Sequence, residues 1–464
     1  MWGNAGKLMG LSAYGKKVAS FPDLIKVRGG DTIILKNGIY SFFKQLGLKP
    51  DNIKSSLNGC VRAVIFRMLS GSPIGKDLAY KAQEELESAM LRITGYIHEK
   101  TGCENLCLAG GVALNCVANG KIVRNSGFKN IFVQPGGMDD GTSIGLAFYG
   151  WHQVLKKQKR FVLKNAFLGV PYGNSDLLSF LEQRPYDRLK KYFRKHPDTS
   201  RLAASLVAAG KTVAWFQGAS EFGPRALGHR SILADPRREE FKVILNDKKG
   251  SEQFRPFAAS VLAEKCAQYF DLDVPSPFML IAAPVKESQR RAIPAVVHVD
   301  GTTRIQTVTE EGNRAFYCLI KEFRKLTGLP LVLNTSFNAK NEPLVETPAE
   351  AVRSFFAMGL DCLVINDYVL ERAKVPAGVV RDAGLGEGFG AKNNRLSWKA
   401  ISKAHHLRAY TKNERKELID LRVLKAHYYT EQRQYAKALR EYKDLMALNP
   451  DIPELKKRIR TEIL

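Results

Sequence analysis

The sequence predicts an α/β protein. Short apolar segments alternate with glycine turns and with longer segments in which apolar side chains recur at helical spacing. This alternation is typical of a mixed or parallel sheet that binds ligands at the ends of its strands. The length of 464 residues allows two or three domains, each with its own core.

The first predicted domain covers residues 1–152. It contains a long amphipathic helix followed by two short apolar strands, each ending in a glycine turn. In chain order the predicted elements are a helix over Lys76–Lys100, a strand over Leu106–Ala109, a turn at Gly110-Gly111, a helix through Asn115, a strand over Ile131–Val133 and a turn over Gln134–Ser143.

A basic linker over residues 153–165 leads to a second predicted α/β domain, residues 166–375. Thr347-Pro-Ala-Glu350 contains the residues of a capping box, with proline at the first helical position, so a helix is predicted to start there. The predicted strands are Thr212–Phe216, Leu331–Leu333 and a closing hairpin of Cys362–Ile365 and Tyr368–Leu370.

The remaining residues are predicted to form a flexible linker (376–393) and a charged helical tail (394–464). Within the tail, Tyr435, Ala438 and Tyr442 fit the second helix of a tetratricopeptide unit. A single unit of this kind cannot bury its own apolar face. We therefore expect the tail to pack on the body, on a partner or on another copy of the chain, which would make a homo-oligomer.

Composition excludes several classes of protein. The seven cysteines form no Cys-x-x-Cys pair, which favours reduced thiols and a cytoplasmic location over a disulfide scaffold. The sequence predicts neither a secretory leader nor a membrane-spanning run. The net charge of +25 is spread over runs that lack interleaved aromatic residues, so nucleic-acid binding is disfavoured.

The most informative segment runs from Glu221 to Arg237. It holds three arginines, two glycines and two prolines, and we expect it to be too irregular for a plain helix or strand. Arginine presents a planar, charged fork that grips phosphate. The alternative is a loop whose arginines pair with surface carboxylates. The cluster with its glycines favours an anion site, whereas a structural role is expected for His229.

This segment resembles the signature of the O-carbamoyltransferases that modify antibiotics and nodulation factors. The resemblance covers residues 1–375 and implies the C-terminal half of an actin-like (ribonuclease H-like) ATPase domain, followed by a domain similar to threonylcarbamoyl-adenylate synthases. Four further segments match that family in the same order, namely Gly6–Gly15, Ala109–Cys116, Phe254–Phe257 and Leu333–Asn338.

The chain departs from the family pattern at its start. In the family, the segment that matches Gly6–Gly15 follows half of the actin-like domain, and that half carries a His-x-x-x-His pair that holds Fe²⁺. None of the eight histidines here has another histidine three or four residues away. The chain therefore resembles a carbamoyltransferase without its front half. A split gene, a late start site and a decayed enzyme would each produce this pattern, and a split gene implies a complementing N-terminal subunit.

In the first domain, the resemblance implies a nucleotide site and part of an iron site. The glycine turn matches a nucleotide-binding segment, where bare backbone N–H groups approach phosphate. Asp139 matches the residue that completes the Fe²⁺ site in the family, although an aspartate in a glycine turn usually only stabilises the turn. The implied nucleotide-binding residues are Gly110, Gly111, Asn115 and Gly141.

In the second domain, the resemblance implies an adenylate-forming site. The family carries a Ser-x-Asn pair, here Ser336 and Asn338, and a Lys-x-Arg pair, here Lys249 with Ser251 in place of the arginine. Arg304 also matches a family position that suits carbamoyl phosphate, although a solvent-facing strand arginine explains it equally well. The candidate catalytic residues are Arg225, Arg230, Lys249, Arg255 and Arg304.

The implied chemistry starts from ATP, with Mg²⁺ bridging its phosphates, and carbamoyl phosphate. These give carbamoyl adenylate, whose carbamoyl group is transferred to a hydroxyl of a small natural-product or sugar acceptor. Two alternatives stay open. A non-catalytic nucleotide-binding scaffold is favoured by Ser251 and the missing front half, and a carbamoyl-adenylate enzyme of tRNA modification is favoured by the basic charge.

Overall fold

The computed structural model describes residues 5–18, 23, 25–29, 32–35, 73–340 and 342–385. Of these, the residues up to Tyr96 belong to one compact unit and those from Ile97 onward to a second. The predicted domain boundary near residue 152 stays a prediction. The predicted helical tail with its tetratricopeptide-like unit lies outside the described residues.

In the first unit, an antiparallel pair of strands precedes one long helix. The elements are α1 (Ala5–Ser12), β1 (Ile25–Arg28), β2 (Thr32–Leu35) and α5 (Pro73–Thr101), whose last residues run past the division. A side chain at Gly15 would collide with the carbonyl of Lys76, so glycine permits this close approach to α5. The predicted helix over Lys76–Lys100 is confirmed.

The second unit begins with a parallel strand pair, β3 (Asn105–Leu108) and β4 (Asn130–Val133), joined by α6 (Cys116–Asn125). The two predicted strands are confirmed. The predicted helix through Asn115 is wrong in detail, because Gly111–Leu114 forms a 3-10 turn and the regular helix begins after Asn115. Asn115 caps that helix with its side chain.

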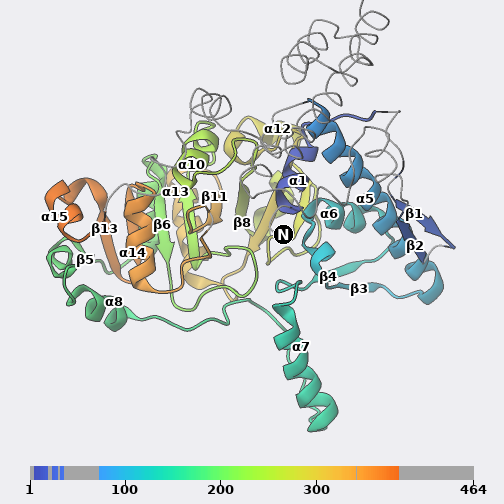
Figure 1. Ribbon diagram of the computed structural model, residues 1–464, viewed down its shortest axis with the longest axis horizontal. Helices are drawn as coiled ribbons and strands as arrows, with labels where there is room; N and C mark the ends of the chain where they lie inside the picture. The colour runs from blue at the N-terminus through green and yellow to red at the C-terminus, as the bar shows by residue number, and fades with distance from the viewer. Residues whose placement is uncertain are drawn as a thin grey trace, which may run out of the picture. The chain divides into compact units, whose positions relative to one another are not determined.

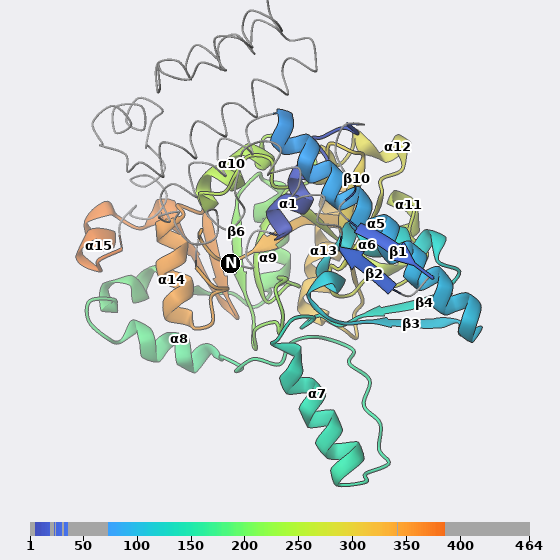
Figure 2. The same ribbon diagram turned by 45° about the vertical axis from the view of Figure 1, so that its right-hand side comes forward.

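An arm follows β4. It consists of α7 (Gly141–Tyr149), which continues into a π-helical turn (Gly150–Val154), and it projects from the rest of the second unit (Figure 2). No residue of α7 is buried. This helix is not among the elements predicted from sequence, because its apolar residues follow no helical period.

The core of the second unit is a mixed sheet of nine strands in the order β5-β13-β12-β6-β7-β11-β8-β10-β9 (Figure 1). Only the pairs β12–β6 and β10–β8 within it are parallel. The mixed α/β class is therefore confirmed. The strands are β5 (Arg194–Lys195), β6 (Val213–Phe216), β7 (Arg230–Ala234), β8 (Ala258–Leu262), β9 (Ile281–Pro284), β10 (Thr302–Val308), β11 (Leu331–Ser336), β12 (Cys362–Ile365) and β13 (Tyr368–Glu371).

Helices cover both faces of this sheet. α9 and α13 share one apolar cluster with the strands, around Trp215 and Phe323, and α8, α10 and α14 share the other, around Phe216 and Phe355. Short 3-10 turns lie at Asp187–Tyr192, Ala263–Lys265, Pro294–Val296 and Arg372–Lys374. The helices are α8 (Asn174–Leu181), α9 (Thr199–Ala208), α10 (Phe241–Lys249), α11 (Cys266–Tyr269), α12 (Glu287–Arg290), α13 (Arg314–Thr327), α14 (Pro348–Ala357) and α15 (Ala377–Asp382).

The expectation that Glu221–Arg237 is too irregular for one plain helix or strand is confirmed for residues 221–229. Within the segment, Arg230–Ala234 form β7, all five residues of which are buried. The other predicted strands and the closing hairpin are confirmed. The capping box is also confirmed, since Thr347 Oγ1 accepts from the backbone N–H of Glu350 over 3.2 Å. The first residues of the predicted linker form α15. No helix among the described residues has the length and apolarity needed to cross a bilayer.

Candidate active site

Lys249, the last residue of α10, directs its amino group into the protein. Its Nζ donates to the carbonyl oxygen of Asn338 over 2.7 Å, to Asn338 Oδ1 over 3.1 Å and to the carbonyl oxygen of Ser336. Ser336 Oγ donates to Asn338 Oδ1 over 2.6 Å. The predicted lysine and the predicted Ser-x-Asn pair are thus in direct contact at the end of β11.

Burial lowers the pKa of the Lys249 amino group to about 7, and the nearby charge of Arg255 lowers it further while Glu342 opposes the shift. Gly250, in the left-handed conformation at φ 62°, ends α10 directly after this lysine. An anion that reached the amino group would favour its protonated form. The lysine is therefore poised to gain a proton when a phosphate binds.

Arg225 and Arg304 form a second cationic group. Arg225 lies in the loop between β6 and β7 and donates to the carbonyl oxygen of Leu114 over 3.4 Å, whereas Arg304 lies near the start of β10. The Nε atoms of both are buried without a hydrogen-bond partner, and neither has a carboxylate partner among the described residues. Burial lowers both pKa values, that of Arg304 to about 9, where Arg225 also contributes.

The two arginines lie beside the first residue of α6. Cys116 interacts electrostatically with both guanidinium groups, and the carbonyl that Arg225 contacts lies two residues earlier. The N-terminus of a helix carries a partial positive charge and free backbone N–H groups. Two arginines and a helix start therefore converge, and the described residues offer no anion that balances them.

The sheet register brings the two cationic groups to one edge. Arg304 lies opposite Ala258 on β8, and Ala258 lies opposite Asn334 on β11, two residues before Ser336. Neighbouring strands lie about 4.8 Å apart, so the backbones of β10 and β11 are about 10 Å apart. One extended ligand with several phosphates can therefore contact both groups, which we call the sheet-edge site.

A buried network of side chains holds the arginine loop on the sheet. Gln306 Nε2 donates to the carbonyl oxygen of Leu227 over 2.8 Å, and Asn334 Nδ2 donates to that of Ala226 over 3.3 Å. Ser260 Oγ joins the two amides, donating to Gln306 Oε1 over 2.6 Å and accepting from Asn334 over 2.9 Å. Because these groups are buried, the network fixes the loop two residues after Arg225.

Arg230 has a different role from Arg225. It is fully buried, stacks 3.5 Å above the ring of Phe216, and donates to the carbonyl oxygens of Gln217 over 2.7 Å and Gly218 over 2.8 Å. Burial lowers its pKa to about 10. Its guanidinium is thus occupied by the backbone, and it positions the loop.

Glu221 clamps the same loop from inside. Its Oε1 accepts from the backbone N–H groups of Leu227 over 2.7 Å, His229 over 2.8 Å and Arg230 over 3.1 Å. One carboxylate oxygen thereby satisfies three donors that the loop leaves outside regular structure. The first residue of the predicted signature is therefore a loop organiser.

Two other arginines are paired with carboxylates. Arg237 donates to Asp235 from Nε over 2.9 Å and from Nη2 over 2.6 Å. Asp235 is buried, so this pair differs from the surface pairing weighed for the loop. Arg255, a predicted catalytic residue, contacts Glu252 over 3.0 Å, although its charge still reaches Lys249. Both arginines would have to leave a carboxylate to grip a ligand.

The histidines of this region are bonded to the backbone. The His229 ring stacks on Phe167 with centroids 3.5 Å apart and its Nδ1 lies 2.7 Å from the carbonyl oxygen of Ala219, in line with the structural role expected for it. His298 Nε2 lies 3.0 Å from the carbonyl oxygen of Phe257, and burial lowers its pKa to about 4. His298 is therefore neutral near pH 7.

The predicted residues of the first domain line a separate cavity of about 440 Å³, which we call the glycine pocket. Gly110, Gly111, Asp139 and Gly141 all border it. Gly141 must lack a side chain, because a Cβ there would lie 1.8 Å from the carbonyl oxygen of Gly136. Asn115 is not among the lining residues and caps α6.

The described residues do not fit an iron site. Among them, no three His, Cys, Asp or Glu side chains lie close enough to share a metal ion. Asp139 borders the glycine pocket without such companions. We therefore assign no chemical step to iron.

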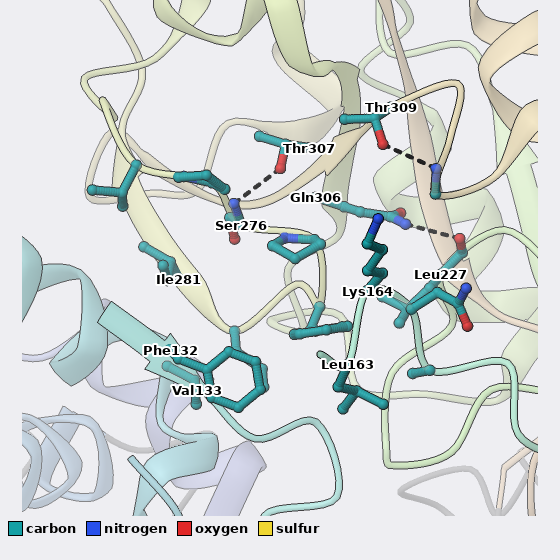
Figure 3. Close-up of a pocket in the computed structure, with 18 of the residues that line it drawn as sticks. Phe132, Val133, Leu163, Lys164, Leu227, Ser276, Ile281, Gln306, Thr307 and Thr309 are labelled. Carbon is teal, nitrogen blue, oxygen red and sulfur yellow. Dashed lines mark hydrogen bonds between the residues drawn. The ribbon is translucent and has the colours of Figure 1, made fainter. Parts of the chain in front are cut away.

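A larger, mostly apolar cavity of about 680 Å³ adjoins the buried network (Figure 3). Phe132, Leu163 and Leu227 contribute apolar walls, and Gln306 reaches it from the network. No residue predicted as functional from sequence lines it.

Two family models match the chain. The carbamoyltransferase N-terminus model matches residues 3–148, and the carbamoyltransferase C-terminus model matches residues 204–372. The chain belongs to the carbamoyltransferase family. The glycine pocket thus lies in the part matched by the N-terminal model, and Arg225, Lys249, Arg304 and Ser336 lie in the part matched by the C-terminal model.

Curated relatives are longer than this carbamoyltransferase. An uncharacterised protein of Synechocystis sp. is 39% identical over 399 residues, which are 80% of this chain and 64% of the relative. The nodulation protein NolNO of Sinorhizobium fredii is 37% identical over 426 residues, 89% of this chain and 58% of its own. The chain therefore spans less than two thirds of the length of these relatives.

Solved structures are less similar. Sua5 of P. abyssi complexed with L-threonine superposes with a TM-score of 0.26 at 15% identity, covering 36% of this chain and 46% of that chain. Full-length HypF in its phosphate- and nucleotide-bound form gives a TM-score of 0.26 at 17% identity, covering 39% and 23%. At this level the superpositions support no argument.

Sequence reasoning missed several residues of the candidate site. Ser260 interrupts the otherwise apolar strand β8, and a polar residue inside such a run is a signal that could have found it. Gln306 lies in β10, where most residues are polar, so no such signal marks it. Cys116 lies at the end of a recognised segment but received no role. Its position at the start of α6, facing both arginines, follows only from the fold.

Proposed function

We propose that the sheet-edge site binds ATP and carbamoyl phosphate and forms carbamoyl adenylate. The observation that carries this proposal is the uncompensated pair Arg225 and Arg304, at the same sheet edge as the contact between Lys249 and Ser336. Buried cations without carboxylate partners are costly unless an anion binds them. Phosphate groups supply that anion, and the family membership supplies carbamoyl chemistry.

The proposed reaction needs one water molecule to balance. Water cleaves carbamoyl phosphate to carbamate and inorganic phosphate. A carbamate oxygen then attacks the α-phosphorus of ATP, the bond to the β-phosphate breaks, and pyrophosphate leaves. The arginines and the lysine would neutralise the charge that moves onto the departing pyrophosphate.

The site would hold Mg²⁺ through the phosphates. The converging side chains are cations, a hydroxyl and an amide, and the carboxylate of Glu342 acts electrostatically on Lys249. Mg²⁺ bound to two phosphates keeps most of its water ligands and needs few protein ligands. When bound, it would share the neutralisation of phosphate charge with Arg225 and Arg304.

Transfer to a hydroxyl of a small acceptor is the proposed second step. The chain covers 64% and 58% of the two relatives described above, so the described residues need not contain the whole acceptor site. We propose that this step requires the part of the relatives that the match leaves out, acting as a complementing polypeptide. The acceptor would be a natural product or sugar.

Pyrophosphate release from ATP tests the proposal. The purified chain is expected to release pyrophosphate only when carbamoyl phosphate is present, and Arg225→Ala is expected to abolish this release. Arg314→Ala is the matched control, because Arg314 is an exposed arginine at the start of α13. Release that is independent of carbamoyl phosphate, or equal in Arg225→Ala, would refute adenylate formation at this site.

A second candidate function is nucleotide binding without turnover. Ser251 favours it, because this serine stands where the family signature carries an arginine and its backbone N–H only closes the end of α10 over 2.8 Å to Asn246. This candidate predicts calorimetric ATP binding that Arg225→Ala weakens, with no pyrophosphate released under any condition.

A further inference from the structure

Lys340 lies at the outer end of the sheet-edge site. Its backbone N–H donates to the carbonyl oxygen of Lys249 over 3.0 Å, so the two lysines are neighbours although they are far apart in the chain. Lys249 is buried, whereas the side chain of Lys340 is 39% exposed. The site therefore continues from the interior toward solvent through a second lysine.

The main chain that carries Lys340 is fixed by its neighbours. The backbone N–H of Ala339 donates to Glu342 Oε2 over 3.2 Å, and Asn338 Nδ2 donates to the carbonyl oxygen of Glu342 over 2.9 Å. These bonds tie the residues on the two sides of Lys340 to each other. The side chain of Lys340 therefore starts from a fixed point beside Lys249.

The side chain of Lys340 is itself held weakly. Its Nζ lies 3.5 Å from Glu252 Oε1, and the other oxygen of this half-buried carboxylate lies 3.0 Å from Arg255 Nε. One carboxylate thus faces two cations. A long ion pair of a partly exposed lysine contributes little to stability, because water screens it. Lys340 can therefore leave Glu252 when a more strongly charged anion binds.

Positive charge exceeds negative charge at this end of the site. Arg255 and Lys340 share the carboxylate of Glu252, and the charge of Glu342 acts on Lys249. Each further phosphate of a ligand adds negative charge close to these cations. The site is therefore expected to bind a nucleotide more tightly as the number of its phosphates grows.

The two lysines reach different parts of a ligand. Nζ of Lys249 donates inward, to oxygens of Ser336 and Asn338, whereas Nζ of Lys340 lies beside Glu252. A ligand with several phosphates in a row can contact both amino groups. The exposed lysine would meet the phosphates at the outer end of that row.

We propose that Lys340 binds the outer phosphates of ATP and makes the sheet-edge site select a nucleoside triphosphate over a nucleoside monophosphate. This inference rests on the proposed binding of ATP at this site. In the proposed reaction the outer phosphates leave as pyrophosphate, and a lysine open to solvent would neutralise the charge that grows on them. A lysine ammonium is a compact charge on a flexible stem, which suits a group that moves away.

Binding of two nucleotides tests this role. With Mg²⁺ present, Lys340→Met is expected to weaken ATP binding by the full chain about tenfold, because a charged contact to phosphate is lost, and to leave AMP binding unchanged. Calorimetry measures both affinities. Lys340→Arg keeps the charge and is expected to retain most of the ATP affinity. The matched control is Lys190→Met, which changes another exposed lysine that pairs with a glutamate over 2.8 Å, and it is expected to bind both nucleotides as the unchanged chain does.

Three results would overturn the role of Lys340. They are equal ATP affinity in Lys340→Met and the unchanged chain, an equal loss of ATP and AMP affinity, and a loss in Lys340→Arg as large as in Lys340→Met. Circular dichroism checks that the variants fold.

Carbamoyl-phosphate-dependent pyrophosphate release is measured on the same samples. Loss of ATP affinity in Lys340→Met without release from the unchanged chain would refute adenylate formation and support the role of Lys340. Release from the unchanged chain with equal ATP affinity in Lys340→Met would do the reverse. Absence of ATP binding by the unchanged chain would overturn both proposals.

Discussion

The sheet-edge site and the glycine pocket are both predicted ligand sites, but they are built from different groups. At the sheet edge, Lys249 on α10 is buried, whereas Arg225 in the arginine loop and Arg304 on β10 are half-buried. The Nε atoms of both arginines are enclosed, and neither arginine has a carboxylate partner among the described residues. The glycine pocket is lined by glycines and apolar side chains together with Gln134, Asp139 and Thr142, and by no lysine or arginine. The first site therefore has the positive charge that the proposed phosphate ligand needs, whereas the second has none.

This difference is the reason why we assign the two steps of the proposed reaction, activation and transfer, to different sites. Preorganised charge is the main source of transition-state stabilisation in phosphoryl chemistry. The sheet-edge site has such charge within one compact unit. The glycine pocket has one carboxylate, Asp139, and no cation among its lining residues.

After the loss expected for Arg225→Ala, the largest effect is expected from removing Lys249. Lys249→Met is predicted to lower carbamoyl-phosphate-dependent pyrophosphate release by about 10²–10³-fold, because a charged donor aimed at phosphate is lost. Lys325→Met, which changes an exposed lysine, is the control. Steady-state rates at saturating ATP measure the effect, and a loss below threefold would remove Lys249 from the site.

The buried network is expected to come next. Gln306→Leu leaves the Leu227 carbonyl and the Ser260 hydroxyl with fewer partners in the interior, which is predicted to lower the free energy of unfolding by about 1–3 kcal/mol. Gln268→Leu changes an exposed glutamine on α11 and serves as the control. Urea denaturation measures both. Equal stability of the two variants would show that the network does not hold the arginine loop.

Two glycines of α7, Gly141 and Gly145, give a matched pair of variants at the glycine pocket. Gly141→Ala would place a Cβ 1.8 Å from a carbonyl oxygen and is predicted to cost about 1–3 kcal/mol of unfolding free energy. Gly145→Ala meets nothing within 4 Å and is predicted to stabilise by up to about 1 kcal/mol. Thermal denaturation compares them. Pyrophosphate release is expected to be unchanged in Gly145→Ala. Its loss would show that the glycine pocket and the sheet-edge site do not act independently.

The smallest expected effect is the uptake of a proton when ATP binds. The folded pKa of Lys249 is about 7, well below the value of 10.5 for an exposed lysine, so at pH 8 its amino group is mostly neutral in the free protein. ATP favours the charged form, and binding at pH 8 should therefore take up to about one proton, and much less at pH 6. Calorimetry in two buffers of different ionisation enthalpy measures this uptake. Equal uptake by Lys249→Met would assign the proton elsewhere.

Because the pKa of Lys249 differs between the folded and the unfolded chain, this lysine also makes the free energy of unfolding depend on pH. Between pH 7 and 10.5 the unfolded chain binds the proton that the folded chain has lost, so this group makes stability rise with pH across that window. A lysine in an ion pair has a raised pKa and would instead make stability fall as the pH rises. The slope should disappear in Lys249→Met.

The sequence predicted the strands that are continuous apolar runs, such as Thr212–Phe216, because burial on both faces leaves a simple pattern. It missed β7 because Arg230 and Ser231 open that strand, and their burial depends on Phe216 and on the loop above. It missed α7 because an apolar helix without a buried face shows no period.

The candidate site was predictable only through the family resemblance. Lys249 and Ser336 are 87 residues apart, and no local pattern indicates that they touch. The resemblance named Arg225, Arg230 and Arg304 together, but the fold separates them. Arg230 faces backbone carbonyls, whereas the other two face each other at the start of α6. Such a distinction depends on which face of the sheet a side chain occupies.

The central claim is that the sheet edge forms an adenylate, and isotope exchange tests it most directly. Labelled pyrophosphate should exchange into ATP only when carbamoyl phosphate is present, because exchange requires reversible formation of carbamoyl adenylate. The account predicts exchange by the unchanged chain and by Arg314→Ala, and none by Arg304→Ala. Absence of exchange from the unchanged chain, or undiminished exchange by Arg304→Ala, would contradict it.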